Sequence, residues 1–451
     1  MIEMQGTVYG PFSSNFQKGL LRDICVNDRG IQTGPFGSQL HQRDYVSIGT
    51  PIVTVEHLGD NRILHDDVPR VSNSDRDRLK RYELKQGDIV FSRVGSVDRR
   101  ALVREAEDGW LFSGRCLRVR ADAAKIDPAF LSYFFGLETF KEHIRAIAVG
   151  ATMPSLNTRL LSDVSVFYPP LAEQRAIAHI LGTLDDKIEL NRRMNETLEE
   201  MARALFKSWF VDFEPVRAKM EGRWHHGQSL PGMPAELYDL FPDGMVSSEL
   251  GEIPAGWRVG TLGNVANEVR VSAQPRSIKP GTPYIALEHM PKRCLALSEW
   301  GVADEVGSNK FRFERGNILF GKLRPYFHKV GIAPLEGVCS TDIVVVAPAG
   351  DCWFGFVLGH VSSDEFVDYT DATSTGTRMP RTKWRDMARY SISLPTRGLA
   401  EAFTAQTQLW VEHVVSAIHE SRALSSLRDT LLPEIVSGKL QVTRRRKRQH
   451  D

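Results

Sequence analysis

The chain has 451 residues, enough for about three domains at roughly 150 residues each. It is 42% hydrophobic and 25% charged, which is typical of a folded protein and argues against extended disorder. Lys and Arg total 57 and Asp and Glu total 56, so the chain has no bulk positive charge with which to bind nucleic acid. Any nucleic-acid surface must therefore be a local basic patch.

No apolar stretch approaches the ~18–20 residues that a membrane span needs, and the first residues do not look like a secretory signal. The five cysteines are scattered and form no C-x-x-C pair, which favours reduced thiols over a zinc site. We therefore expect a cytoplasmic protein with no membrane partner and no metal.

The most informative feature is an internal repeat. Residues 49–58 (GTPIVTVEHL) recur as 281–290 (GTPYIALEHM), and 87–91 (GDIVF) recur as 316–320 (GNILF). Near the end of each half, 150–154 (GATMP) recur as 376–380 (GTRMP). The displacements are 232, 229 and 226 residues, so the order is kept and the shift is about half the chain. The pattern predicts two copies of one module.

Short apolar runs separated by Gly, Pro, Asn and Asp predict strands in each copy. They lie at 50–55, 88–91, 117–119 and 164–168 in the first copy and at 318–320, 343–346 and 390–394 in the second. Helices are expected over 130–147 and, as a candidate, over 355–369. Each globular part should therefore mix α and β structure.

After each globular part, apolar residues recur at the three-four spacing of a coiled-coil seam. We expect the first helix to end near residue 215 and the second to stop at Pro433. Asn191 and Asn195 interrupt the first seam and could set the register of a helix pair. The seam residues are Ile177, Leu181, Leu184, Ile188, Leu198 and Leu205 in the first helix, and Phe403, Trp410, Val414, Leu424 and Leu431 in the second.

The stripe over 177–209 would span about 50 Å at ~1.5 Å per residue, longer than a compact module of this size needs. We therefore favour an antiparallel pair of the two helices over the alternative that each packs only on its own domain. Residues 216–250, rich in Gly, Pro and Ser, are expected to connect the copies. The basic run 444–448 is either a solvated end or an arm that grasps phosphate.

No catalytic constellation is present in the sequence. Residues 316–322 approximate a P-loop, but Leu323 stands where Ser or Thr must meet magnesium. Residues 168–171 (YPPL) resemble an amino-methyltransferase motif without its Asn or Asp. The adjacent Glu and His of the repeated GTP motif point to opposite faces if they lie on a strand, so neither pair readily chelates a metal. We therefore expect no catalytic and no metal-binding residues.

A basic, turn-prone segment follows the repeated GDIVF-type strand in each copy, and its residues differ between the copies. Such loops could contact DNA, because Arg pairs with guanine, Lys and His meet phosphate, and Tyr presses on bases or sugars. The alternative is that they are solvated hairpin tips. The candidates are Arg93, Arg99 and Arg100 in the first copy, and Lys322, Arg324, Tyr326, His328 and Lys329 in the second.

Six stretches of the chain follow a family pattern: 87–93 (GDIVFSR), 169–177 (PPLAEQRAI), 184–191 (LDDKIELN), 205–213 (LFKSWFVDF), 248–257 (SELGEIPAGW) and 431–440 (LLPEIVSGKL). With these stretches the chain resembles the specificity subunit of type I restriction-modification enzymes over nearly its whole length. Two departures stand out. The EIPAGW opener precedes only the second copy, and the second copy lacks the PPLAEQ junction.

The resemblance implies an α+β fold in which two similar α/β target-recognition domains are separated by a long antiparallel two-helix coiled coil. Each recognition domain would read one half of a bipartite, asymmetric site in double-stranded DNA. The coil would set the spacing and dock two methyltransferase subunits that carry S-adenosylmethionine. Separate restriction and translocase subunits would use ATP and Mg. This chain would be non-catalytic and hold no cofactor itself.

Other functions stay open at this point: a fused enzyme that modifies DNA alone, or a coiled-coil scaffold that does not bind DNA. The expected segments are an uncertain lead (1–18), a first recognition domain (19–170), a first helix (171–215), a connector (216–250), a second recognition domain (251–396), a second helix (397–440) and a basic tail (441–451).

Overall fold

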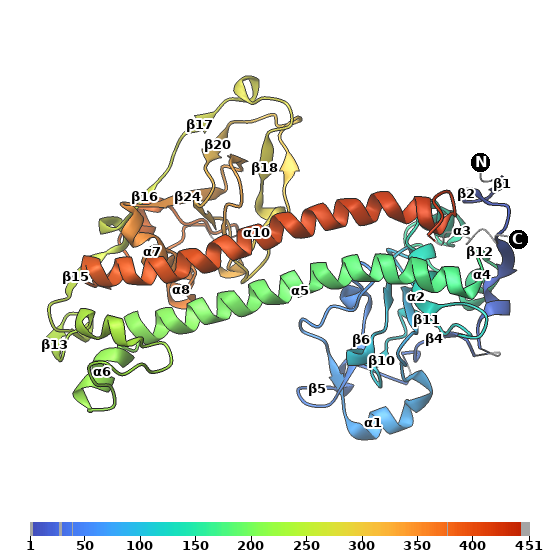
Figure 1. Ribbon diagram of the computed structural model, residues 1–451, viewed down its shortest axis with the longest axis horizontal. Helices are drawn as coiled ribbons and strands as arrows, with labels where there is room; N and C mark the ends of the chain where they lie inside the picture. Colours follow the sequence, from blue (N-terminus) through green and yellow to red (C-terminus); the bar gives the residue numbers. More distant parts are fainter. Residues whose placement is uncertain (1–2, 27–28, 38, 377, 443–451) are drawn as a thin grey trace, which may run out of the picture. The chain divides into compact units, whose positions relative to one another are not determined.

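The computed structural model describes residues 3–26, 29–37, 39–376 and 378–442. The chain forms two compact units, unit 1 (Met1–Asp186 and Leu424–Asp451) and unit 2 (Lys187–Ala423). Two helices of 40 residues each, α5 (Leu171–Phe210) and α10 (Arg397–Val436), contribute one segment to each unit (Figure 1). The basic run 444–448 lies outside the described residues.

Unit 1 is built on a four-stranded antiparallel sheet in the order β4-β11-β8-β9. The strands are β1 (Met4–Thr7), β2 (Gly10–Ser13), β3 (Gln17–Leu20), β4 (Ile31–Thr33), β5 (Tyr45–Val46), β6 (Thr50–Val53), β7 (Arg70–Val71), β8 (Ile89–Ser92), β9 (Arg100–Leu102), β10 (Leu111–Phe112), β11 (Cys116–Val119) and β12 (Ser165–Tyr168). The helices are α1 (Asn73–Arg78), α2 (Pro128–Phe134), α3 (Glu138–Ile147) and α4 (Thr158–Ser162). Every residue of β8 and β11 is buried, as expected of central strands rich in branched and aromatic side chains.

Unit 2 repeats this sheet in the order β16-β24-β21-β22. Its strands are β13 (Met245–Ser248), β14 (Gly251–Pro254), β15 (Arg258–Thr261), β16 (Ala266–Glu268), β17 (Ser272–Ala273), β18 (Pro283–Ile285), β19 (Gly301–Val302), β20 (Lys310–Phe313), β21 (Ile318–Gly321), β22 (Val330–Ile332), β23 (Gly337–Cys339), β24 (Ile343–Pro348) and β25 (Ser391–Leu394). Its helices are α6 (Glu214–Met220), α7 (Phe354–Val361), α8 (Asp364–Ala372) and α9 (Trp384–Met387).

The internal duplication is visible in the strand pairing. In unit 1 the parallel pair β6–β10 accompanies the antiparallel sheet, and in unit 2 the parallel pair β18–β23 does the same. The strand that follows the first globular part, β12, pairs with β3, while β25 pairs with β15. The predicted fold class, two similar α/β modules joined by long helices, is confirmed.

Each half also opens with the same β-hairpin, which the sequence did not reveal. The hydroxyls of Thr7 and Ser248 each accept the N–H of the second residue on, at 3.1 Å in both hairpins. Gly10 and Gly251 then take left-handed φ angles of 95° and 92°. The lead over 1–18 therefore contains the counterpart of β13–β14, although only one hydroxyl and one glycine mark the likeness.

Two predicted helices are each split in the structure. The expected helix over 130–147 is α2 followed by α3, with Gly136 between them, where the Arg100 guanidinium packs against the backbone. The expected helix over 355–369 is α7 followed by α8, which Ser363 caps by accepting the Phe366 N–H at 3.2 Å. Hydrophobic content alone did not show these breaks.

The expectation that Pro433 ends the second helix was wrong, because α10 continues to Val436. A proline inside a helix removes one backbone hydrogen bond and frees a carbonyl. Pro433 is exposed and lies in the last turn, so water can satisfy that carbonyl.

Within unit 1 the segments of α5 and α10 run antiparallel. Ile177 and Leu181, both fully buried, share one apolar cluster with Ile435 and Val436. Further along α5, an Asp185 carboxylate oxygen lies 2.8 Å from the Arg428 guanidinium of α10. The partner number falls as the α5 number rises, which is the antiparallel order.

Within unit 2 the two helices also run antiparallel. Leu198 packs with Val414 and Ile418, and the rings of Trp209 and Phe403 lie 5.5 Å apart. Asn191, fully buried, donates from Nδ2 to Glu420 at 2.7 Å and to Ser421 at 3.2 Å, so the seam contains a polar layer.

Several of the seam residues predicted for the two helices stay partly exposed. Across both units they are Leu184, Ile188, Leu198, Leu205, Trp410, Leu424 and Leu431.

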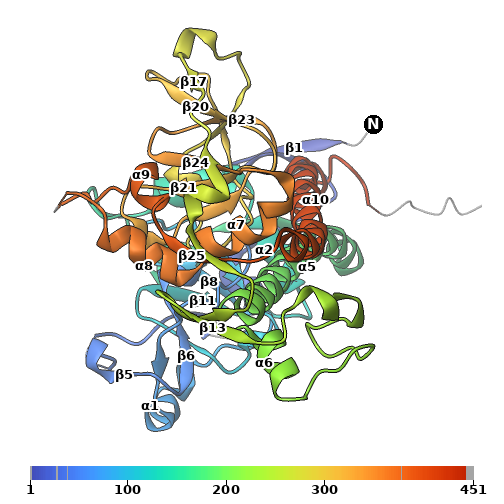
Figure 2. The ribbon, with the colours of Figure 1, turned by 90° about the vertical axis from the view of Figure 1, so that its left-hand side faces the viewer.

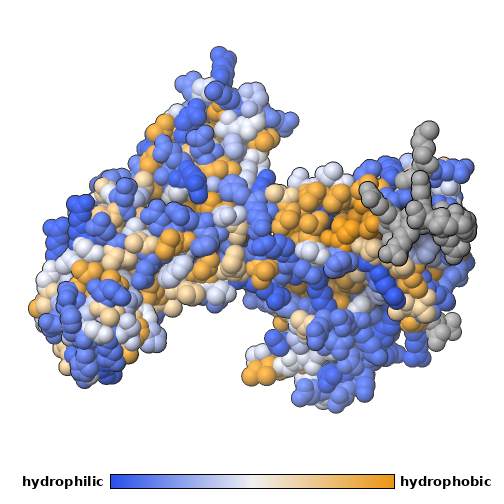
Figure 3. Space-filling view, viewed as in Figure 1, coloured by the Kyte–Doolittle hydropathy of each residue, from blue (hydrophilic) through white to orange (hydrophobic). Residues whose placement is uncertain are grey.

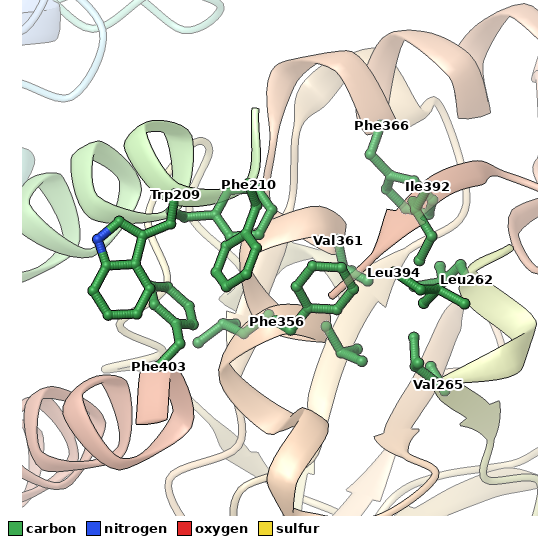
Figure 4. Close-up of a cluster of buried hydrophobic side chains, with 14 of the residues drawn as sticks. Trp209, Phe210, Leu262, Val265, Phe356, Val361, Phe366, Ile392, Leu394 and Phe403 are labelled. Atoms are coloured by element: carbon green, nitrogen blue, oxygen red, sulfur yellow. The ribbon is translucent and has the colours of Figure 1, made fainter. Parts of the chain in front are cut away.

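The core of unit 2 continues from the helix pair into the globular part (Figure 4). Trp209, Phe210 and Phe403 of the long helices meet Phe356 of α7, with the rings of Phe210 and Phe356 5.0 Å apart. Across the described residues, no helix has the length and apolar character needed to span a membrane.

Candidate nucleic-acid interface

The three repeated motifs, far apart in sequence, meet around one loop in unit 1. The loop follows β8, and its Gly95 N–H donates to the Pro154 carbonyl at 2.9 Å. Leu156 N–H donates back to the Arg93 carbonyl at 2.9 Å. The Arg99 guanidinium donates to the carbonyl of Leu58, at the end of the GTP motif. The motifs therefore form a frame that holds the segment over 92–100.

Unit 2 builds the same frame. Arg324 N–H donates to the Pro380 carbonyl at 2.8 Å, and Thr382 N–H donates to the Lys322 carbonyl at 3.0 Å. Lys329 Nζ donates to the Leu287 carbonyl at 2.6 Å. The backbone contacts thus match those of unit 1, while the loop side chains differ. A shared frame that holds different side chains is an arrangement suited to recognising two different targets.

The histidines of the repeated Glu-His pairs each cap a short turn of the frame. His57 Nδ1 accepts the Thr54 N–H at 3.3 Å, and His289 Nδ1 accepts the Ala286 N–H at 3.0 Å. Each ring therefore caps its own short 3₁₀ turn. Among the described residues no cluster of three or more His, Cys, Asp or Glu side chains could hold a metal ion.

The first-copy candidates lie in different surroundings. Arg93 is half-buried, lies 5.7 Å from the Phe36 ring centroid and donates from Nη1 to the Gly114 carbonyl at 3.1 Å. Arg100 is only 5% exposed and donates from Nε to the Ser132 carbonyl at 2.8 Å. Burial lowers the pKa of Arg100, an effect that the nearby Asp60 carboxylate opposes. Arg100 therefore holds the fold together and is not available at the surface.

Among the second-copy candidates, Tyr326 is the most open, at 51% exposed. Lys322, Arg324 and Lys329 are half-buried, and Arg324 Nε has no hydrogen-bond partner among the described residues. His328 is only 3% exposed; its Nδ1 lies 3.1 Å from Asp364, and Nε2 lies 3.0 Å from the Ser362 carbonyl.

The environment of His328 does not suit a phosphate contact. Burial lowers the pKa of this imidazole, and the Ser362 carbonyl and the Asp364 carboxylate oppose that shift. Both ring nitrogens face groups of the protein itself, and the enclosed ring is not open to DNA. Sequence reasoning could not separate His328 from its exposed neighbour Tyr326, because both lie in one short polar loop.

A cavity of about 920 Å³ opens beside the unit 1 loop. Its lining includes Arg93 with Phe36, Tyr45, His57 and the exposed Arg115, of which only Arg93 was predicted from the sequence. The segments meet tightly here because Gly34 and Gly114 let backbone approach backbone; a Cβ on either would overlap a carbonyl. The signal that could have revealed them is the pair of glycines with flanking aromatic and basic residues.

Comparisons with known proteins agree with this geometry. The model of the family described as "Type I restriction modification DNA specificity domain" matches residues 20–200. The type I restriction enzyme MjaIX specificity subunit of Methanocaldococcus jannaschii is 27% identical over 327 residues, 69% of this chain and 69% of that protein. The HindI specificity subunit of Haemophilus influenzae is 24% identical over 437 residues, 86% of this chain and 95% of that protein.

The fold matches as well. A solved structure of a type I restriction-modification S subunit from M. genitalium superposes with a TM-score of 0.54 at 13% identity, over 93% of this chain and 96% of that one. The family model and the two relatives confirm the resemblance that the motifs indicated, and the model of that family matches residues 20–200.

Proposed function

We propose that this chain is the DNA-specificity subunit of a type I restriction-modification complex, acting in the cytoplasm. Each recognition domain reads one half of a bipartite, asymmetric site in double-stranded DNA. The observation that carries the proposal is the pair of matching frames, in which the same backbone contacts hold Arg93 in one unit and Lys322 in the other. Two copies of one scaffold with different basic side chains can read two different sequences.

In unit 1 we assign DNA contact to Arg93 and to the exposed Arg115 beside it; Arg99 supports the loop through Leu58. In unit 2 we assign contact to Lys322, Arg324 and Tyr326, with Lys329 at the base of the loop. An Arg fork can bond guanine O6 and N7, and each good contact of this type discriminates by about 1–3 kcal/mol. Arg100 and His328 take no part, because both are buried.

The long helices are proposed to set the spacing of the half-sites and to dock two methyltransferase subunits, which bring S-adenosylmethionine. Apolar side chains gather on the surface over the C-terminal part of α10, where Leu427 is 48% exposed (Figure 3). In unit 2, Leu190 and Met201 of α5 are 58% and 50% exposed. Exposed apolar surface of this kind marks protein interfaces. Restriction and translocase subunits would add ATP and Mg to the complex.

The test is to map methylated adenines in cells that express the chain with its methyltransferase partner. We expect a two-part motif with a fixed gap. Replacing Arg93 or Arg115 by Ala should relax the motif in one half, and replacing Lys322 or Arg324 should relax the other, each by about tenfold to hundredfold in discrimination. The control is Arg223→Ala, which also removes one positive charge but lies in the connector, where Arg223 pairs with Glu214 and Glu221. This variant should leave the recognition of both half-sites intact.

If a single loop variant relaxed the sequence specificity in both halves of the motif, the assignment of one half-site to each unit would be wrong. Methylation by the isolated chain would instead support a fused enzyme. Absence of any sequence-selective DNA binding by the assembled complex would support a scaffold role.

A further inference from the structure

Two exposed methionines occupy matching positions in the two units. Met153 is 58% exposed and Met379 is 48% exposed, and both precede the proline of the third repeated motif. The loops that these motifs frame have diverged, yet both copies keep this apolar side chain at the surface. A single exposed methionine needs no explanation, but the same one at equivalent positions of two diverged copies calls for a shared role.

The backbone presents each methionine at the tip of a tight hairpin. Val149 and Ser155 exchange backbone hydrogen bonds of 3.0 and 2.9 Å below Met153, and Thr375 and Arg381 exchange two of 3.0 Å below Met379. These pairs close both hairpins in the same way.

A glycine makes each of these turns possible. Gly150 and Gly376 adopt left-handed φ angles of 115° and 108°. A Cβ on them would lie 2.6 Å and 3.1 Å from the carbonyl oxygens of Met153 and Met379 respectively. Each glycine therefore allows a tight turn beside an exposed methionine, and no other residue type fits the glycine position without strain.

Each tip lies directly beside a basic loop. The residue after each methionine, Pro154 or Pro380, accepts the backbone N–H of Gly95 or Arg324 respectively. Figure 2 shows the unit 2 tip, between α8 and α9, extending away from α10. Arg378, next to Met379, is also exposed. A partner bound at the basic loop therefore lies close to the methionine.

We propose that Met153 and Met379 are apolar DNA contacts, one for each half-site, that press on features common to every sequence: the deoxyribose faces and base edges of a groove. This rests on the proposed function. A residue identical in two readers cannot carry the difference between their targets. The flexible thioether adapts to varied surfaces, and apolar side chains are known to wedge against base steps. The tips would thus supply affinity, and the loops would supply sequence choice.

The first experiment measures DNA affinity of the full chain assembled with its methyltransferase partner, on a duplex carrying the mapped site. Met153→Ala and Met379→Ala should each weaken binding by about fivefold to tenfold. This is the cost of losing an apolar side chain that bound DNA covers in part. The same factor is expected on duplexes in which either half-site is scrambled. Met→Leu at either tip should bind nearly as the wild type, and Met220→Ala, at a methionine 56% exposed on α6, should have no effect.

The second experiment maps oxidation by dilute peroxide, read by mass spectrometry. We expect the duplex to protect Met153 and Met379 several-fold from sulfoxide formation while Met220 reacts equally with and without DNA. This readout needs no variant, so it stands even if a substitution disturbs folding.

Unchanged affinity of both Ala variants, or equal oxidation of the tips with and without DNA, would overturn the inference. So would a weaker assembly with the methyltransferase at unchanged DNA affinity, since the tips would then contact the protein partner. A loss confined to one sequence would make the methionines readers and also refute it. Failure of the proposed function looks different, because the wild-type complex itself would then show no sequence preference.

Discussion

The two units pack the ends of the long helices with different side chains at equivalent sites. A displacement of 226 residues relates Ile177 to Phe403 and Trp209 to Ile435. All four are 2% exposed or less, so burial is preserved. Volume is not, because unit 2 carries an aromatic ring at each of these sites and unit 1 an aliphatic chain. Duplication has kept which positions face inward and left each core to fit its own neighbours.

The same contrast holds where the globular part meets the helices. In unit 1 the Asp60 carboxylate lies 2.9 Å from Arg428, which also lies 2.8 Å from Asp185; Tyr133 donates to Asp185 at 2.6 Å. In unit 2 one carboxylate oxygen of Glu199 accepts the backbone N–H groups of two consecutive residues, Leu295 and Ala296, at 2.9 Å each.

A backbone feature shows that these docking loops are equivalent. Asn61 and Arg293, 232 residues apart, both take left-handed φ angles, of 56° and 54°. One loop has therefore been docked by ion pairs in unit 1 and by a backbone-binding carboxylate in unit 2. The difference predicts that the two units respond unequally to similar substitutions.

The largest effect is expected at the helix ends. Trp209→Ala should cost unit 2 about 3–5 kcal/mol, because the ring is fully buried among Phe210, Phe241 and Phe403. Ile435→Ala at the equivalent site should cost unit 1 about 2–4 kcal/mol. Hydrogen exchange resolved by peptide gives each unit's stability, with the unchanged unit as the internal control. A larger loss for Ile435→Ala would show that side-chain volume does not rank the two cores.

A smaller effect is expected where the globular parts dock. Asp185→Ala should cost unit 1 about 2–3 kcal/mol, since it leaves Tyr133 and the largely buried Arg428 with fewer partners. Glu199→Gln should cost unit 2 at most about 1 kcal/mol, because an amide oxygen can still accept both N–H groups. Denaturant titration of the two variants, read by the same exchange peptides, measures the difference. Equal losses would contradict the distinction between ion-pair and backbone docking.

The smallest effect is a pH dependence of opposite sign in the two units. Burial alone would raise the pKa of Asp60, but Arg100 and Arg428 lower it below its usual 3.8. The stability that ionised Asp60 contributes to unit 1 is therefore fully present above pH 3.8 and is lost as the pH falls through the lowered pKa. Burial raises the pKa of Glu199 above its usual 4.5, although the N–H groups of Leu295 and Ala296 oppose this. Its contribution is present below that pH and is lost as the pH rises through the raised value.

Urea unfolding between pH 3 and 7 gives the free energy of unfolding of the wild type and of the variants Asp60→Asn and Glu199→Gln. The difference between each variant and the wild type, followed against pH, isolates the contribution of that residue. We expect a few tenths of a kcal/mol for Asp60, whose side chain stays 60% exposed and is screened by solvent. Differences of the same sign for the two residues would refute the assigned pKa directions.

The repeated motifs predicted the duplication, and the spacing of apolar residues predicted the mixed α/β modules and the pair of long helices. These depend on patterns along the chain, and strand burial and helix periodicity are local properties that a sequence displays directly. The hairpin of β1–β2 could not be predicted from the sequence, because its turn needs only a hydroxyl and a glycine, which occur in many contexts.

Tertiary structure alone decided which basic residues face outward. Arg99 and Arg100 are neighbours in one segment, yet Arg99 is partly exposed and Arg100 lies inside against Ser132. It also brought Phe36 and Arg115 to Arg93, from segments far apart in sequence. The orientation of a charged side chain depends on where distant backbone carbonyls and carboxylates come to lie, and no local pattern carries that information.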